Sequence, residues 1–271
     1  MRRFSADYLE QTRKGMWADS TEALVDLDLA NRTRILDVGC GTGELTRVVA
    51  SEATADARVV GCDVDTSLLA VAREHTPVVA SDACRLPFAD DSFDLVVCQA
   101  LLINLPDPAA ALQEFARVSS DLVAAIEPNN AEVSVDSTVD REVELDARVR
   151  DAYLDGVETD VALGEQVEAL FETAGIEPLS THRYIHEKRT EPPYSETALT
   201  SATRKASGAG LADSKRELQA GLADSETSYD ELRAAWREMG RAVIDQMQAE
   251  TYERVERVPF DVTAGRVNDQ P

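Results

Sequence analysis

The sequence predicts an α/β fold with a mostly parallel sheet of seven strands and helices on both faces. The first observation is the apolar run 35–38, which passes into a glycine-rich turn at 39–43 and then into a segment with helical periodicity. The second is the series of strand-like segments at 58–62, 77–80, 94–98 and 121–126, separated by turns and helical segments. Two later strands are expected at 177–187 and 258–267.

Three glycines, Gly39, Gly41 and Gly43, follow the first strand at a spacing of two. Glycine adopts positive φ without strain and lets the backbone approach a ligand, so this spacing indicates a binding loop. A purely structural strand-to-helix turn is the alternative. The helix that follows has an apolar face that can pack on the sheet, formed by Leu45, Val48 and Val49.

Asp63 ends the second predicted strand, twenty residues after Gly43. A carboxylate in this position can accept hydrogen bonds from both hydroxyls of a ribose. Together with the glycine turn, it indicates a nucleoside ligand. A nicotinamide dinucleotide is disfavoured, because no glycine occupies the third position that the Gly-x-Gly-x-x-Gly fingerprint requires.

With these residues the chain resembles the class I S-adenosylmethionine-dependent methyltransferases, in the small-molecule type 11 group, over about residues 30–130. Further matching motifs follow in the family's order: Ser81-Asp82-Ala83, Leu86-Pro87-Phe88, Asp90-Asp91-Ser92-Phe93-Asp94 and Leu105-Pro106-Asp107-Pro108. The resemblance implies a Rossmann-like fold. It also implies that the glycine loop holds the methionine end of the cofactor, Asp63 its ribose and Asp82 its adenine amino group.

The cofactor so implied is S-adenosyl-L-methionine, with S-adenosyl-L-homocysteine as product. The residues expected to line its site are Asp37, Gly39, Cys40, Gly41, Gly43, Asp63, Val64, Asp82, Ala83, Gln99 and Arg13. The nucleic-acid amino-methylases of this family carry an Asn- or Asp-Pro-Pro-aromatic motif after the fourth strand, where this chain has Cys98-Gln99-Ala100-Leu101.

The charge of the chain is strongly acidic, with 51 Asp and Glu against 27 Lys and Arg and a formal net charge of −24. This balance, with only four lysines, is typical of a protein from a high-salt cytoplasm, where self-repulsion is screened; an ordinary acidic protein is the alternative. Such a surface repels phosphates, so we expect no nucleic-acid substrate. No apolar stretch resembles a signal peptide or a membrane span, which predicts a cytoplasmic protein without a membrane partner.

Four cysteines are spaced without a Cys-x-x-Cys pair, so free thiols and no metal site are expected. The strand at 121–126 ends in polar residues that should face the same crevice as the glycine loop, although a polar turn is an equal alternative. The residues assigned to the substrate side are Tyr8, Trp17, Asn104, Glu127, Asn129 and Asn130. In the family, a segment like residues 8–17 often folds over the cofactor, with Arg13 facing its carboxylate; an ordinary docking helix is the alternative.

If residues 258–267 form the last strand, residues 191–255 are an insertion before it. The expected domains are therefore a cofactor-binding domain, 1–190 with 256–271, and a helical cap, 191–255. Helices are expected at 140–154, 164–174 and 230–254, the last with a Ser228–Glu231 capping box. Its apolar stripe can form the core of the cap, line a pocket or form a homodimer seam: Leu232, Trp236, Met239, Val243 and Met247.

His182, Tyr184 and His186 share one face of the sixth strand if that strand is extended, and one of them could act as a base. A structural or surface histidine is the alternative, and the catalytic residue stays unassigned. We expect a methyltransferase that acts on a small-molecule metabolite. The alternatives are a noncatalytic S-adenosylmethionine-binding partner subunit and a protein or RNA methyltransferase.

Overall fold

The computed structural model describes residues 9, 16–17 and 21–268, and the chain forms two compact units. The first, the sheet unit, takes in the described residues up to Asn129 together with 162–184 and those from Phe260 onward. The second, the helical unit, takes in 130–161 and 185–259. It is larger than the expected insertion 191–255, because residues 130–161 contribute a strand and a long helix to it.

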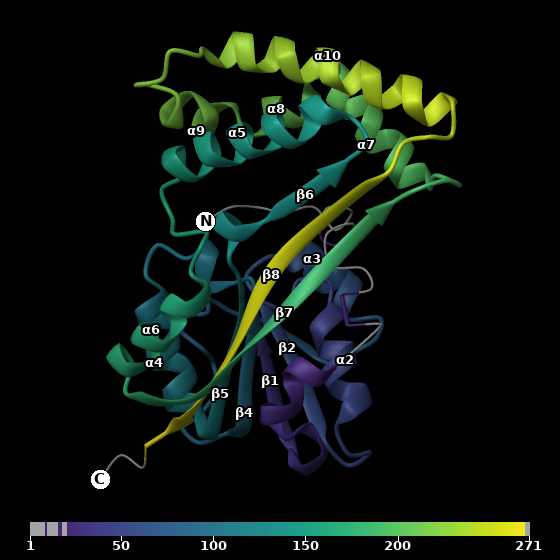
Figure 1. The fold of residues 1–271 in the computed structure, drawn as a ribbon. Coiled ribbons are helices and arrows are strands. Elements are labelled where there is room, and N and C mark those ends of the chain that lie inside the picture. The colour runs from purple at the N-terminus through teal and green to yellow at the C-terminus, as the bar shows by residue number, and fades with distance from the viewer. Residues whose placement is uncertain (1–8, 10–15, 18–20, 269–271) are drawn as a thin grey trace. The chain divides into compact units, whose positions relative to one another are not determined.

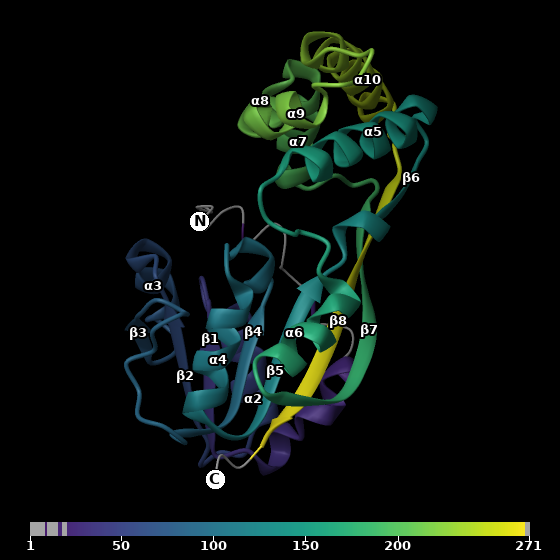
Figure 2. The same ribbon diagram turned by 90° about the vertical axis from the view of Figure 1, so that its left-hand side faces the viewer.

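Five parallel strands form the centre of the sheet unit, in the order β3-β2-β1-β4-β5 (Figures 1 and 2). The order reverses at β1, and in open α/β sheets ligands bind beyond the carboxyl ends of the strands at such a switch point. The strands are β1 (Arg34–Val38), β2 (Arg58–Asp63), β3 (Val78–Ala80), β4 (Phe93–Gln99) and β5 (Ser119–Pro128).

Two long strands complete the sheet. β8 (Arg254–Val267) pairs antiparallel with β5, and β7 (Ile176–Thr190) pairs with β8. These are the predicted sixth and last strands. An eighth strand, β6 (Ser134–Ser137), pairs with the first part of β8 inside the helical unit. The prediction of seven strands missed it because this segment has four residues, three of them polar, and no clear apolar alternation.

Helices cover both faces of the sheet, as predicted (Figures 1 and 2). On one face lie α2 (Glu44–Glu52) and α3 (Thr66–Ala72), and on the other lie α4 (Pro108–Val118) and α6 (Val167–Thr173). The sheet unit also contains short 3₁₀ turns, two of them before β1: η1 (Glu22–Leu27), η2 (Leu29–Asn31), η3 (Leu102–Asn104) and η5 (Gly164–Gln166).

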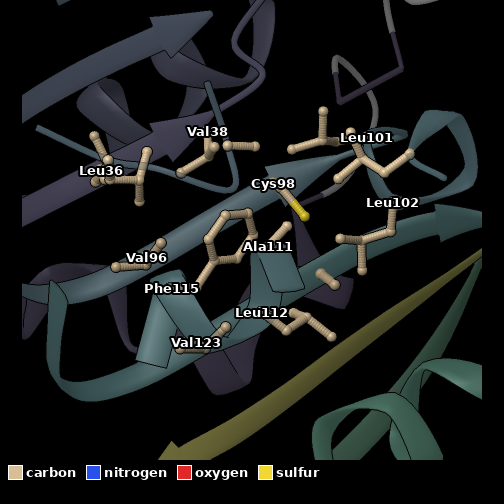
Figure 3. Packing of buried hydrophobic residues seen from close by; sticks show 14 of the residues in the cluster. Leu36, Val38, Val96, Cys98, Leu101, Leu102, Ala111, Leu112, Phe115 and Val123 are labelled. Atoms are coloured by element: carbon tan, nitrogen blue, oxygen red, sulfur yellow. The ribbon is translucent and has the colours of Figure 1, made fainter. Parts of the chain in front are cut away.

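The main core of the sheet unit lies between the sheet and α4 (Figure 3). Phe115 and Leu112 of α4 are fully buried there together with Val96 and Val123 of the two central strands. Burying such side chains contributes roughly 1.5–3 kcal/mol each. The helix is set in place by its start, where Asp107 accepts the N–H of Ala110 at 3.0 Å. This packing makes the carboxyl ends of the strands a rigid base for a binding site.

The helical unit has its own core, formed mainly by five helices and bordered by the short turn η4 (Asn130–Glu132). The predicted stripe of α10 is buried inside this unit, which supports core packing among its three possible roles. The Ser228–Glu231 capping box is present, but α10 ends at Gln248 because Glu250 takes a left-handed conformation (φ 55°) before β8 begins. The helices are α5 (Asp140–Gly156), α7 (Glu196–Ser207), α8 (Ala209–Asp213), α9 (Lys215–Gly221) and α10 (Tyr229–Gln248).

A network of buried charges joins the strands of the helical unit to its helices. Glu142 of α5 is fully buried, accepts from the Tyr252 hydroxyl at 2.9 Å and pairs with Lys205. Arg254 lies 2.7 Å from Glu256 and 3.1 Å from Asp146. Burial of these charges is tolerable because each has an opposite partner.

Candidate functional site

The glycine turn connects the end of β1 to α2 and has the left-handed backbone that its glycines predict. Gly39 has φ +72° and Gly41 φ +54°. The turn is tied to β2, because the N–H groups of Gly39 and Cys40 both donate to the Cys62 carbonyl, at 2.7 and 3.0 Å. A Cβ on Gly39 would lie 2.8 Å from a methyl carbon of Leu101. The turn therefore needs glycine both for its conformation and for its contact with the segment after β4.

Asp63 at the end of β2 is bound to this turn. Its Oδ2 accepts the N–H of Gly41 at 2.9 Å, and its Oδ1 accepts the N–H of Asp65 at 2.8 Å. Each carboxylate oxygen has two lone pairs, so the group keeps acceptor capacity for two more donors. The next residue, Val64, is 51% exposed, which leaves an apolar surface beside the carboxylate. Asp63 and Val64 together fit a ligand that combines hydroxyl groups with a flat apolar part.

Asp37 lies in β1 just before the turn and Cys40 lies within it, and both side chains are buried. Oδ2 of the buried Asp37 accepts the hydroxyl of Thr46 at 2.5 Å, which fixes the first turn of α2. The Cys40 sulfur fills the space left by Gly61, where a Cβ would lie 2.8 Å from it. Burial and the nearby carboxylates raise the pKa of Cys40 far above the usual range of a thiol, so it stays protonated. In the structure these two buried side chains help to hold the turn in place through their contacts with α2 and β2.

Asp82 and Ala83 follow β3 at the same edge of the sheet. Asp82 is exposed, and its Oδ1 accepts the N–H of Cys84 at 2.9 Å, while Ala83 is buried. The exposed carboxylate keeps acceptor capacity for an amino group.

Gln99 ends β4 and is 3% exposed. Its Oε1 accepts the indole N–H of Trp17 at 3.3 Å, and its Nε2 lies 2.9 Å from Sδ of Met16. Trp17 stacks on Tyr184 of β7 with ring centroids 5.1 Å apart, and the Tyr184 hydroxyl donates to the Met16 carbonyl. Met16 and Trp17 thus lie on the end of β4. Tyr8 and Arg13 lie outside the described residues.

Leu9 lies against the glycine turn. It is buried, and a Cβ on Gly41 would lie 2.9 Å from its Cδ1. Neither Leu9 nor Met16 was assigned to the site from the sequence. Their apolar character close to the polar Tyr8 and Arg13 was the only available signal.

Glu127 was expected to face the substrate, and the structure instead buries it completely. Its Oε1 accepts the N–H groups of Leu101 and Leu102 at 3.0 and 2.9 Å, and its Oε2 accepts that of Ile103 at 3.3 Å. The first N–H groups of a short 3₁₀ turn have no main-chain acceptors, and here the Glu127 carboxylate accepts their hydrogen bonds. Glu127 is therefore a structural anchor of the segment that follows β4.

The three asparagines assigned to the substrate side lie in different surroundings. Asn104 ends η3, is 7% exposed and donates from Nδ2 to the Ala100 carbonyl at 2.8 Å. Asn129 follows β5 and lies against Gly164, where a Cβ would come within 3.1 Å of it. Asn130 belongs to the helical unit, where its Nδ2 donates to the Val161 carbonyl at 2.6 Å.

The three base candidates on β7 have different partners and surroundings. His182 is exposed and pairs with Asp26 at 2.8 Å, and hydrogen bonds from Ser180 and His182 lower the pKa of Asp26. His186 is buried and belongs to the helical unit. Between them, Tyr184 holds Met16 as described above. The pattern missed Arg183, whose Nε and Nη2 bind the buried Asp261 at 2.8 and 2.9 Å and join β7 to β8.

The described part of the chain contains no cluster of three or more His, Cys, Asp or Glu side chains arranged to hold a metal ion. Among the same residues, no helix is both long and apolar enough to cross a membrane.

Comparison with known proteins agrees with this geometry. Residues 36–121 match the family model described as a methyltransferase domain. A demethylmenaquinone methyltransferase from Lactiplantibacillus plantarum is 35% identical over 106 residues, which cover 36% of this chain and 45% of that protein. One from Staphylococcus aureus is 37% identical over 99 residues, covering 34% of this chain and 41% of that protein. The match therefore spans less than half the length of these curated relatives.

Solved structures share the fold. A Bacillus halodurans protein described as a methyltransferase superposes with a TM-score of 0.52 at 17% identity, covering 91% of this chain and 99% of that one. The YcgJ protein of Bacillus subtilis gives 0.52 at 16% identity, with 90% and 97% covered. Residues 36–121 thus form a class I methyltransferase domain within a Rossmann-like fold, which confirms the predicted resemblance.

Proposed function

We propose that this protein is an S-adenosylmethionine-dependent methyltransferase that acts on a small molecule. The observation that carries the proposal is the bond from the Gly41 N–H to Asp63. It joins a left-handed glycine turn to a carboxylate with acceptor capacity left, at the switch point of the sheet. The match of residues 36–121 to a methyltransferase domain supports the same cofactor.

The residues present fit that cofactor. Asp63 is held beside the left-handed turn and keeps acceptor capacity for hydroxyl groups, and the exposed Val64 and Asp82 follow β2 and β3. We assign the ribose hydroxyls to Asp63, the adenine amino group to Asp82 and the apolar adenine face to Val64. The methionine end is assigned to the turn 39–43, which is held in place by the buried side chains of Asp37 and Cys40.

Methyl transfer is an in-line displacement in which the bound cofactor supplies an electrophilic methyl group. The task left to the protein is to hold the nucleophile about 3–3.5 Å from that carbon in a site without water. Leu9 and Met16 exclude water beside the turn and Gln99, and both are at most 5% exposed. The rigid segment after β4 offers fixed polar groups next to this edge.

A metabolite substrate is favoured over a macromolecule by the acidic chain and by the match to enzymes named for a quinone. Because those matches cover the cofactor-binding part, they say little about which small molecule is the acceptor. We further propose a cytoplasmic location, since all four cysteines are free.

The test is transfer of a radiolabelled methyl group from S-adenosylmethionine, at low and at molar salt, to a small-molecule cell extract and separately to its protein and RNA. The account expects label in the small-molecule fraction. Label in protein or RNA alone would contradict the substrate class. Cofactor binding without transfer to any fraction would indicate the noncatalytic subunit instead.

A further inference from the structure

We propose that Oδ1 of Asn104 accepts the hydrogen carried by the nucleophilic atom of the methyl acceptor, which makes the acceptor an amine with an N–H or a hydroxyl compound. The proposal rests on the proposed function and names the substrate class for that site. It depends on three properties of the segment between β4 and α4, which are its rigidity, one unused polar atom and its contact with the glycine turn.

The segment 100–105 is rigid because every main-chain N–H in it has an acceptor. The N–H of Ala100 donates to the Ile126 carbonyl at 2.8 Å, and the next three donate to Glu127. Those of Asn104 and Leu105 close the 3₁₀ turn at 2.9 and 3.1 Å. Because moving this backbone would break these hydrogen bonds, they hold the segment in place.

One polar atom of this segment is left over. Asn104 is 7% exposed, and its Nδ2 is bound to the Ala100 carbonyl at 2.8 Å, which fixes the amide plane. Oδ1 is buried, and within the described part of the structure it has no hydrogen-bond donor. A buried amide oxygen without a partner costs roughly 1–3 kcal/mol, so a site that keeps one needs a reason.

The segment lies against the cofactor turn. The Leu101 side chain, three residues before Asn104, occupies the space that a Cβ on Gly39 would need. Ala100 has a left-handed backbone (φ 47°), a conformation that costs an alanine energy and that clusters at functional sites. The amide oxygen is therefore carried by a strained, fixed segment in contact with the loop assigned to the methionine end of the cofactor.

A purely structural role explains Nδ2 of Asn104 but not Oδ1. The bond from Nδ2 holds the Ala100 carbonyl, but it gives no use to Oδ1. An amide oxygen accepts hydrogen bonds and is too weak a base to remove a proton. Its contribution is to orient a nucleophile that still carries its hydrogen, so that the lone pair points at the methyl carbon.

The reaction balances without a further reagent. The nucleophilic nitrogen or oxygen forms a bond to the methyl carbon while the bond from that carbon to sulfur breaks, and the electron pair of that bond stays on sulfur as a thioether. The hydrogen bound to Oδ1 leaves as a proton to water once the product is formed. Thiolates, carbon nucleophiles and tertiary amines bring no such hydrogen and would leave Oδ1 unpaired.

The experiment identifies the methylated atom and then tests Asn104. The full chain is incubated with labelled S-adenosylmethionine and a small-molecule cell extract, and the methylated atom of each labelled product is assigned by mass spectrometry and NMR. Asn104→Leu and the smaller Asn104→Ala are compared with Asn31→Leu, which changes an exposed asparagine bound to Asp28. S-adenosylhomocysteine affinity and melting temperature are measured for each.

We expect an N-methyl or O-methyl product from an acceptor whose nucleophilic atom carries a hydrogen. An N-methyl product identifies the acceptor as an amine, and an O-methyl product identifies it as a hydroxyl compound. Both Asn104 variants should lower kcat/KM for that acceptor roughly tenfold or more, with S-adenosylhomocysteine affinity within about twofold of wild type. A thioether, a methylated carbon or a quaternary product overturns the inference alone, as does a loss of kcat/KM that only follows a loss of cofactor affinity. If no product is labelled, the proposed function fails and this inference fails with it.

Discussion

The main-chain N–H of Gly41 donates to Oδ2 of Asp63 at 2.9 Å, so the turn after β1 and the acid at the end of β2 form one unit. Asp63 therefore has two roles, since it shapes the glycine turn and keeps lone pairs for a ligand. Any change to either residue will alter both the turn and the site.

Gly39→Ala should reduce both stability and cofactor affinity. The left-handed backbone costs an alanine roughly 1–2 kcal/mol, and the new Cβ would press on Leu101 at 2.8 Å. Gly175→Ala is the matched control, because Gly175 has φ +79° but nothing lies within 4 Å of its added Cβ. Thermal unfolding should show the larger loss for Gly39→Ala, and calorimetry should show weaker S-adenosylhomocysteine binding for it alone. Equal effects of the two variants would contradict the contact.

Glu127→Gln should destabilise the protein by about 1–3 kcal/mol. The carboxylate accepts three buried N–H groups, and an amide turns its own NH₂ toward at least one of them. Thermal melts are to be compared with those of Glu74→Gln, which changes an exposed side chain. A melting temperature equal to that of wild type would show that the anchor is not needed.

The helical unit should lose stability in acid. Burial by itself would raise the pKa of Glu256, but Arg254 and Lys188 lower it to about 2. Because the folded pKa lies below the unfolded value of about 4.3, the stabilisation is complete above that value and is lost as the pH falls toward 2. The loss is on the order of 2–3 kcal/mol.

The measurement is the melting temperature from pH 6 to pH 2 for wild type and Glu256→Gln. The variant should be less stable at pH 6 and show a shallower decline below about pH 4.5, since its side chain does not titrate. Parallel curves for the two proteins would refute this assignment of the acid sensitivity.

Trp17 should report cofactor binding. The chain has two tryptophans, and the other, Trp236, is buried in the core of the helical unit. Since the Trp17 indole is bound to Gln99 beside the proposed site, S-adenosylhomocysteine should change the emission of Trp236→Phe. Trp17→Phe is the complementary variant and should respond little. A response carried by Trp236 alone would place the ligand elsewhere.

The half of the chain that binds the proposed cofactor was predictable because its pattern is local. Apolar strands such as 35–38 are followed directly by the glycines and acids that their carboxyl ends present. The parallel order then brings Gly41 and Asp63 together without further information. The long strands β7 and β8 were also predicted, and β8 and its antiparallel pairing came from the resemblance to the family's last strand.

Contacts between segments far apart in the sequence were not predictable. In the sequence, Glu127 looked like a polar residue at a strand end. Only the fold shows that the main-chain N–H groups of residues 101–103 donate to its carboxylate. The end of α10 was placed too late because residues 249–254 contain no glycine or proline to mark it. Likewise, Arg254 of β8 pairs with Glu142 and Asp146 of α5, which lie far away in the sequence.

The expected homodimer seam on α10 has less support than before, since its apolar stripe is buried within the helical unit. The high-salt origin stays a prediction from composition. Melting temperature as a function of potassium chloride concentration tests it, with a strong rise toward molar salt expected from screening of the net charge of −24.

The central claim is that the turn 39–43 and Asp63 hold S-adenosylmethionine. Calorimetric titration of S-adenosylmethionine and S-adenosylhomocysteine into wild type, Asp63→Asn and Asp224→Asn tests it most directly, because both variants remove one negative charge and Asp224 is exposed in the helical unit. We predict binding by wild type and Asp224→Asn, and an affinity at least tenfold weaker for Asp63→Asn, since the amide takes away acceptors for the ribose. Folded wild-type protein that binds neither ligand would contradict the account.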